Sequence, residues 1–129
     1  ISTSRRTPEH TLLAIRHIAP NARIWSADQT PPGWVAAQLQ QAGQVWVTED
    51  SVSMIYESLT AGGQVGLLST PRIRSDRITD AVDELIRQQA LTTYDQWRQD
   101  HQGQPARPFC EAERAARWLL AQEGLCAAR

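Results

Sequence analysis

The stretch that decides the fold is Gln44-Val45-Trp46-Val47-Thr48-Glu49-Asp50-Ser51-Val52-Ser53-Met54-Ile55-Tyr56-Glu57, continued by Ser58-Leu59-Thr60-Ala61-Gly62-Gly63-Gln64-Val65-Gly66-Leu67-Leu68. Its apolar pattern predicts a buried strand, a tight polar turn, an amphipathic helix that ends at the glycine pair, and a second buried strand. Four apolar side chains at helical spacing form the inward stripe of the helix: Val52, Ile55, Tyr56 and Leu59. The stretch is therefore a βαβ unit, the repeat from which parallel sheets are built.

The turn of this unit is a candidate anion-binding site. Ser51 and Ser53 stand where the helix begins, and there the backbone amides are unpaired and the helix dipole is positive. Glu57 follows Ser53 by four residues, so it lies one turn further along on the same face. A carboxylate in that place can grip ribose hydroxyls beside bound phosphates, so the stretch predicts a nucleotide site.

The rest of the chain alternates in the same way. We expect short strands at residues 1–5 and 22–25, and a helix at 7–19 with Thr7 as its cap and Pro8 in its first turn. A second helix is expected between the turn-rich loop 26–32 and its stop at Gly43, and further helices at 76–90 and 110–123. Residues 92–107 are polar, with Tyr94 and Trp97 as their large apolar anchors. The expected inward side chains are Leu12, Ile15 and Ala19, then Val35, Leu39 and Ala42, and then Ile78, Val82, Leu85 and Ile86.

This alternation predicts an α/β fold, a Rossmann-like parallel sheet with helices on both faces and right-handed crossovers. Ligands of such sheets collect at the carboxyl ends of the strands. The rule gathers residues 4–6, 25–26, 48–53 and 69–72 along one edge. A length of 129 residues suits one domain, 1–129, and the abrupt start in a strand without methionine leads us to expect the second half of a larger protein.

Composition narrows the functional classes. The net charge is −1, from 13 basic and 14 acidic side chains, which disfavours a nucleic-acid partner. Every basic residue is arginine, so a catalytic lysine is excluded. No apolar run approaches the roughly 20 residues of a membrane span, and the first residues do not show a signal-peptide pattern. Cys110 and Cys126 are expected to be free thiols in a reducing cytosol, and the three histidines have no ligand spacing, so no metal is expected.

Each candidate residue also has an alternative interpretation. Ser51 and Ser53 are first of all residues that cap helices, and Glu57 can be a solvated acid on a helix face. Glu49 and Asp50 would repel a phosphate unless a metal, Arg5 or Arg6 compensated their charge. We favour Asp50 as the helix cap and Glu49 as a solvent-facing side chain over paired acid–base catalysis.

The arginines are ambiguous in a similar way. Arg5 and Arg6 can clamp a phosphate with two hydrogen bonds each, yet adjacent arginines on a loop are as often solvated. Arg72 and Arg74 have a weaker claim to the same role.

Three separated segments resemble one family. They are Ser4-Arg5-Arg6-Thr7-Pro8, Val47-Thr48-Glu49-Asp50-Ser51-Val52-Ser53-Met54, and Pro108-Phe109-Cys110-Glu111-Ala112-Glu113-Arg114-Ala115-Ala116. The chain resembles the mitochondrial-fission ELM-like group, whose bacterial members are often labelled putative nucleoside-diphosphate-sugar proteins. That group is similar to GT-B glycosyltransferases, which have two Rossmann-like halves facing across a cleft. The resemblance implies that this chain is the C-terminal half, which holds the nucleotide sugar.

The resemblance also implies roles for single residues. Glu57 would bind the ribose, and Ser51, Ser53 and the backbone of Met54, together with Thr48, would hold the diphosphate. Ser4, Arg5 and Arg6 would approach the diphosphate from the loop after the first strand, and the loop at Trp25 and Ser26 would face the base. The family tends to have Asn-Pro-Tyr where this chain has Pro31-Pro32-Gly33-Trp34, so no role is expected there.

Two hypotheses of different classes follow. The first is the nucleotide-sugar-binding half of a GT-B-like transferase, inactive alone, with its catalytic base and acceptor site mostly on a missing N-terminal domain. The second is a catalytically silent α/β domain that binds a partner protein. An epimerase is less favoured because no G-x-G-x-x-G loop follows the opening strand. In either case we expect a cytoplasmic bacterial protein with no cofactor and no integral membrane segment, and a peripheral place at the inner membrane face stays open.

Overall fold

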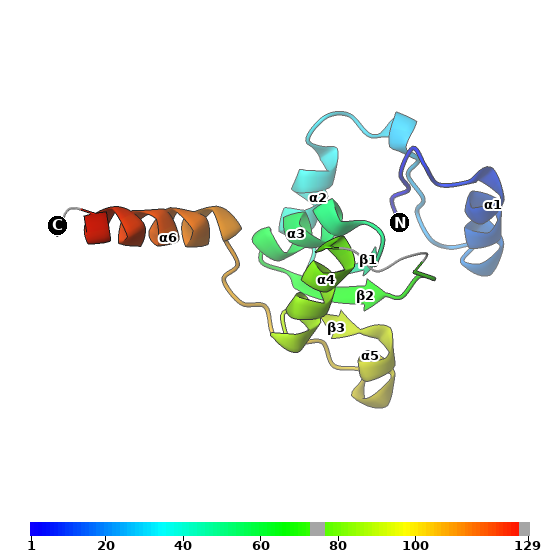
Figure 1. Ribbon diagram of the computed structural model, residues 1–129. Helices are drawn as coiled ribbons and strands as arrows, with labels where there is room; N and C mark the ends of the chain where they lie inside the picture. Colours follow the sequence, from blue (N-terminus) through cyan, green and yellow to red (C-terminus); the bar gives the residue numbers. More distant parts are fainter. Residues whose placement is uncertain (73–76, 127–129) are drawn as a thin grey trace. The chain divides into compact units, whose positions relative to one another are not determined.

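The computed structural model describes residues 1–72 and 77–126 (Figure 1). The chain forms two compact units, Ile1–Gln38 and Leu39–Arg129. The expected phosphate role of Arg74, the inward side chain of Ile78 and the thiol of Cys126 lie outside the described part.

A three-stranded parallel sheet organises the second unit, in the order β1-β2-β3 (Figure 1). Strand β1 (Gln44–Thr48) pairs with β2 (Gln64–Leu68), and β2 pairs with the short β3 (Thr92–Thr93). Helix α3 (Val52–Thr60) connects β1 to β2 and is followed by Gly62 at φ +85°, a backbone conformation that glycine adopts without strain. The predicted βαβ unit is therefore confirmed.

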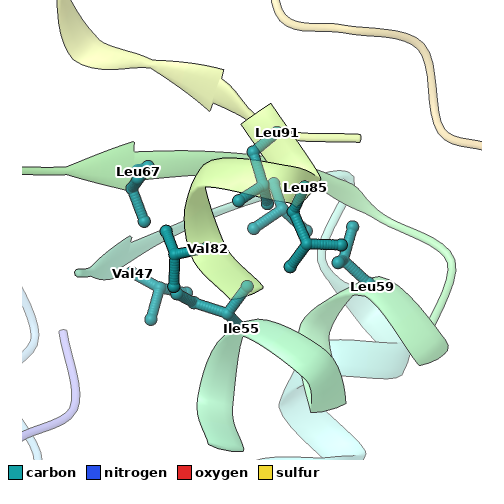
Figure 2. Close-up of a cluster of buried hydrophobic side chains, with 8 residues drawn as sticks. Val47, Ile55, Leu59, Leu67, Val82, Leu85 and Leu91 are labelled. Atoms are coloured by element: carbon teal, nitrogen blue, oxygen red, sulfur yellow. The ribbon is translucent and has the colours of Figure 1, made fainter. Parts of the chain in front are cut away.

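The core lies between one face of this sheet, α3 and α4 (Arg77–Arg87). Strand residues at alternate positions point toward the two helices, and Ile55 of α3 is completely buried among them (Figure 2). Two of the four side chains predicted for the α3 stripe are buried, and the other two pack against the core while staying partly exposed. The buried cluster consists of Val47, Ile55, Leu59, Val65, Leu67, Val82, Leu85 and Leu91.

A different helix covers part of the opposite face. Trp46 alternates with the core-facing valines of β1, so its ring points away from the core. There it meets Tyr94 and Trp97 of α5 (Tyr94–Asp100) edge-on, with ring centroids 6.0 and 5.5 Å away. Helices therefore lie on both faces of the sheet, and the predicted α/β Rossmann-like class is confirmed.

The polar segment 92–107, for which no helix or strand was predicted, contains β3 and α5. Thr93 and Gln96 form a capping box, in which each side chain bonds the other residue's backbone amide. This signal starts α5 although the helix has few apolar residues. Thr92 is buried beside β2 by tertiary contacts that no local pattern reveals.

The last helix agrees with the prediction. Helix α6 (Glu111–Cys126) begins one residue after the expected start and extends three residues beyond the expected end. Just before it, the Phe109 ring lies 5.7 Å from that of Tyr56 and packs against the core. On α6 itself three large apolar side chains are exposed, Trp118, Leu119 and Leu120. Within residues 1–72 and 77–126, no helix combines the length and apolar character that crossing a membrane requires.

The first unit is less regular than predicted. It contains α1 (Glu9–Ile18), a short 3-10 helix η1 (Ala27–Gln29) and the start of α2 (Trp34–Gln41), whose buried Leu39 belongs to the second unit. The two strands expected at residues 1–5 and 22–25 shrink to a single parallel bridge between Ser2 and Trp25. Residues 5–6 form a turn and η1 begins at Ala27, so the pairing is limited to this bridge.

The helix start in this unit also differs from the prediction. The residue that caps α1 is Pro8, and the helix start has no capping side chain. The hydroxyl of Thr7 instead accepts a hydrogen bond from the amide of Ser4 at 3.0 Å, so it closes the preceding loop. No residue of α1 is fully buried, and its expected inward side chains, Leu12, Ile15 and Ala19, are only partly buried.

Candidate functional site

The site is built where β1 ends and α3 begins. Thr48 is the last residue of β1, and its carbonyl accepts a hydrogen bond from the Ser51 amide at 2.9 Å. Ser51 is the N-cap of α3, yet its hydroxyl makes no capping hydrogen bond and receives one from the Thr48 hydroxyl at 3.4 Å. Ser51 therefore leaves the amides of the first helical turn available to another acceptor.

The predicted cap is wrong. Asp50 stands one residue before the N-cap, and it is exposed. Because the helix begins at Val52, the N-cap position falls on Ser51, and Asp50 is a residue of the turn. A free carboxylate thus borders the helix start and opposes an anion there.

Two of the predicted contact residues lie on the accessible face of α3. Ser53 and Glu57 are both exposed and four residues apart, so they share one face with a separation of about 6 Å along the helix axis. Met54 is partly buried and packs against the core, and its carbonyl accepts the Ser58 hydroxyl at 2.7 Å. Its contribution to a site would come from its backbone amide.

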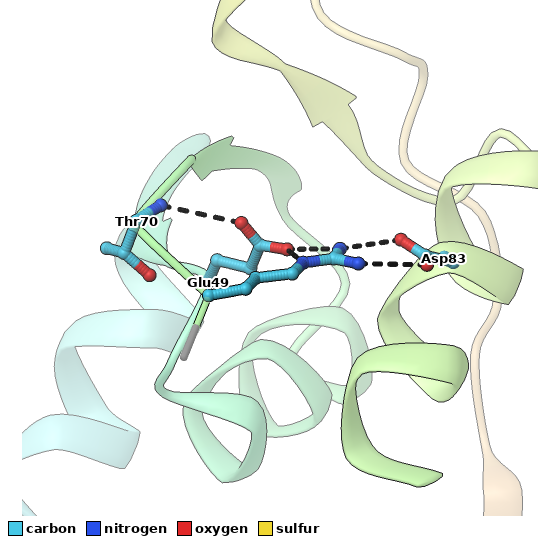
Figure 3. A network of polar contacts seen from close by, with 4 residues as sticks. Glu49, Thr70 and Asp83 are labelled. Carbon is cyan, nitrogen blue, oxygen red and sulfur yellow. Dashed lines mark hydrogen bonds and ion pairs between the residues drawn. The ribbon is translucent and has the colours of Figure 1, made fainter. Parts of the chain in front are cut away.

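Glu49 was predicted to face solvent, and this prediction is wrong: the residue is 91% buried. Its backbone amide donates to the Leu68 carbonyl at 2.9 Å, which continues the sheet pairing one residue beyond β1. Its carboxylate accepts from the Thr70 amide at 3.4 Å and pairs with the guanidinium of Arg72 (Figure 3). The expectation failed because burial follows from pairing with the next strand, which a single segment does not show.

Arg72 joins this carboxylate to a second one. Its two terminal nitrogens donate to Asp83 of α4 at 3.0 and 2.6 Å (Figure 3). The hydrogen bonds to Asp83 and Glu49 raise the pKa of Arg72 above its usual value, and the same guanidinium lowers the pKa of Asp83. Arg72 is thus held by two carboxylates, an arrangement that competes with the phosphate role suggested for it.

Sequence reasoning missed this cluster of Glu49, Thr70, Arg72 and Asp83 as a unit. A usable signal existed for two of its members. Glu49 directly follows β1 and Arg72 follows β2, and the carboxyl ends of neighbouring parallel strands meet at one edge. The place of Asp83 depends on how α4 packs, and the sequence carries no local sign of it.

The other predicted phosphate contacts belong to the first unit. The loop at residues 4–7 is closed by its own hydroxyls: the Arg6 amide donates to the Ser4 hydroxyl at 3.1 Å, and the Ser4 amide to the Thr7 hydroxyl. The side chains of Arg5 and Arg6 are exposed. Trp25, expected near a base, lies 5.3 Å from the ring of Trp34. The gathering of these residues with 48–53 stays a prediction.

A small cavity lies at the other end of the strands. Its volume is about 20 Å³, the room of a single water, and its walls include Leu59, Gly63, Gln64, Gln104 and Phe109. Gln64 begins β2, so the cavity is at the amino end of that strand and is far too small for a nucleotide. Within the described residues, no group of three or more histidine, cysteine or acidic side chains is arranged to hold a metal ion.

Comparison with known proteins identifies one family. A family model described as Mitochondrial fission ELM1 matches residues 1–122, nearly the whole chain. No curated protein and no solved structure matches the chain.

Proposed function

The chain belongs to the mitochondrial fission ELM1 family, and from this premise we propose that it binds a nucleoside diphosphate sugar as one half of a GT-B-like glycosyltransferase. The observation that carries the proposal is the start of α3. A helix start without a capping bond from its N-cap side chain directly follows a parallel strand, at the edge where ligands of such sheets bind.

The ligand would lie along the first turns of α3. The diphosphate would accept from the amides that Ser51 leaves uncapped and from the hydroxyls of Thr48, Ser51 and Ser53, with the Met54 amide at the end of the turn. Glu57, exposed one turn further, would accept hydrogen bonds from the ribose hydroxyls. The spacing of about 6 Å between the levels of Ser53 and Glu57 suits a phosphate and the adjoining ribose.

The charge at this edge needs compensation. Asp50 is exposed beside the helix start, and the Arg72 guanidinium is held by Glu49 and Asp83. The family resemblance implies that Ser4, Arg5 and Arg6 supply this compensation and that the loop at Trp25 and Ser26 faces the base. No metal or cofactor is part of the proposal.

The chemistry would require a second half. The catalytic base and the acceptor site would come mostly from an N-terminal domain, so the 129-residue chain by itself would be inactive. We further propose a bacterial protein located in the cytoplasm, with a peripheral place at the inner membrane face as the remaining option.

A silent partner-binding domain is the second candidate. The exposed Trp118, Leu119 and Leu120 on α6 favour it, because large apolar side chains close together on a surface mark protein contacts. An epimerase is less favoured, since the chain lacks the glycine-rich dinucleotide loop.

Calorimetric titration of the chain with UDP, GDP, ADP and CMP tests the proposal. We expect saturable binding of one diphosphate and, in Glu57→Ala, a loss of affinity of roughly ten- to hundredfold, the range of one hydrogen bond to a charged group. Asp95→Ala, which removes an exposed acid in the first turn of α5, is the matched control and should bind like the unmodified chain. If none of the four nucleotides binds, the nucleotide site is refuted and the partner-binding domain is favoured.

A further inference from the structure

The charged cluster of Glu49, Arg72 and Asp83 links three parts of the second unit: the turn before α3, the segment after β2, and α4. Its two acids have unequal surroundings, since the side chain of Glu49 is 10% exposed and that of Asp83 is 50% exposed. Arg72, at 36%, lies between them.

This asymmetry shows which pairing matters. A buried carboxylate without a cation is strongly destabilising, whereas a half-exposed one is well solvated by water. Glu49 has lost most of its water, and its described partners are Arg72 and the Thr70 amide. Asp83 helps to orient the guanidinium but does not depend on it.

We propose that Arg72 is a positioning residue of the α3 anion site: it neutralises the buried Glu49 and holds residues 69–72 against the turn, without touching the ligand. The inference rests on the proposed function. Glu49 lies two residues before the N-cap Ser51, so its uncompensated charge would act on an anion through a poorly screened interior.

Four variants separate this role from direct phosphate contact. Arg72→Gln leaves Glu49 charged and unpaired, Glu49→Gln removes the charge, and the double variant removes both. Asp83→Asn leaves Arg72 on Glu49 and serves as the matched control. Each is titrated by calorimetry with the nucleotide that the unmodified chain binds and with inorganic pyrophosphate, and circular dichroism checks the fold of each.

If Arg72 acts through Glu49, Arg72→Gln weakens binding on the order of tenfold. The double variant then binds within about twofold of the unmodified chain, as does Asp83→Asn. A double variant as weak as Arg72→Gln would overturn the inference, because Arg72 would then be a phosphate ligand. Should Arg72→Gln fail to fold, the double variant alone decides: strong binding without Arg72 supports the inference, and weak binding overturns it.

The same titrations keep the two proposals apart. Binding of pyrophosphate without binding of any nucleotide would refute the proposed function, while the variants would still test Arg72 with pyrophosphate. Unchanged binding of both probes by Arg72→Gln would overturn the role of Arg72 and leave the nucleotide proposal standing. If the unmodified chain binds neither probe, both proposals fall.

Discussion

Replacing Gly66 by alanine should disturb the side of the sheet that faces α5. A Cβ atom at this position would lie 2.4 to 2.6 Å from three atoms of the Trp46 ring, whereas carbon atoms in contact are about 3.5 to 4.0 Å apart. The ring would have to retreat by roughly 1 Å. It packs edge-on against Tyr94 and Trp97, so the retreat would also disturb these contacts.

The magnitude follows from two opposing effects. Overpacking of this kind costs about 1 to 3 kcal/mol. Removal of a glycine from a strand returns about 0.5 to 1 kcal/mol through lower backbone entropy in the unfolded chain. We therefore expect Gly66→Ala to lower the free energy of unfolding by about 1 to 2 kcal/mol.

Urea denaturation followed by far-UV circular dichroism measures this loss, and near-UV circular dichroism reports the displaced tryptophan. Trp46→Leu supplies the control background, because the atoms that clash are absent there. In that background Gly66→Ala should be neutral or stabilising, which gives a coupling between the two positions. A Gly66→Ala protein within about 0.5 kcal/mol of the unmodified chain would refute the reasoning.

Three further predictions concern other parts of the second unit. Ile55→Ala opens a cavity at a fully buried position and should lower the unfolding free energy by about 2 to 5 kcal/mol, while an unchanged urea midpoint would contradict the assigned core. Thr93→Ala removes one half of the capping box with Gln96 and should cost about 1 kcal/mol; Thr93→Ser, which keeps the hydroxyl, should recover most of it in the same assay. Asp83→Asn should cost less than about 1 kcal/mol at pH 7, because the pair with Arg72 is half exposed. Since Arg72 lowers the folded-state pKa of Asp83, this contribution is fully present above the unfolded-state pKa of about 3.9 and is lost as the pH falls through the folded-state value, so unmodified chain and variant should converge in acid.

Local sequence was enough for the elements with strong periodicity. The apolar pattern of residues 44–68 predicts β1, α3 and β2, since alternation and helical spacing are properties of the chain alone. The α/β class follows from the alternation of these strands and helices. Gly62-Gly63 predicts the end of α3 because the chain leaves the helix through a positive φ, which Gly62 adopts without strain. The relative placement of Ser51, Ser53 and Glu57 could be predicted for the same reason, since it depends only on helix geometry, while their binding roles stay a prediction.

The tertiary structure decided what depends on neighbours distant in sequence. Glu49 is polar and next to a turn, which locally indicates exposure, but pairing with β2 buries it and Arg72 compensates its charge. β3 has only two residues, too few to show an alternating apolar pattern. It forms because its backbone pairs in parallel with the edge of β2. Burial and ion pairing thus depend on packing between segments that are distant in sequence. The periodicity of a helix or strand depends only on the order of consecutive side chains.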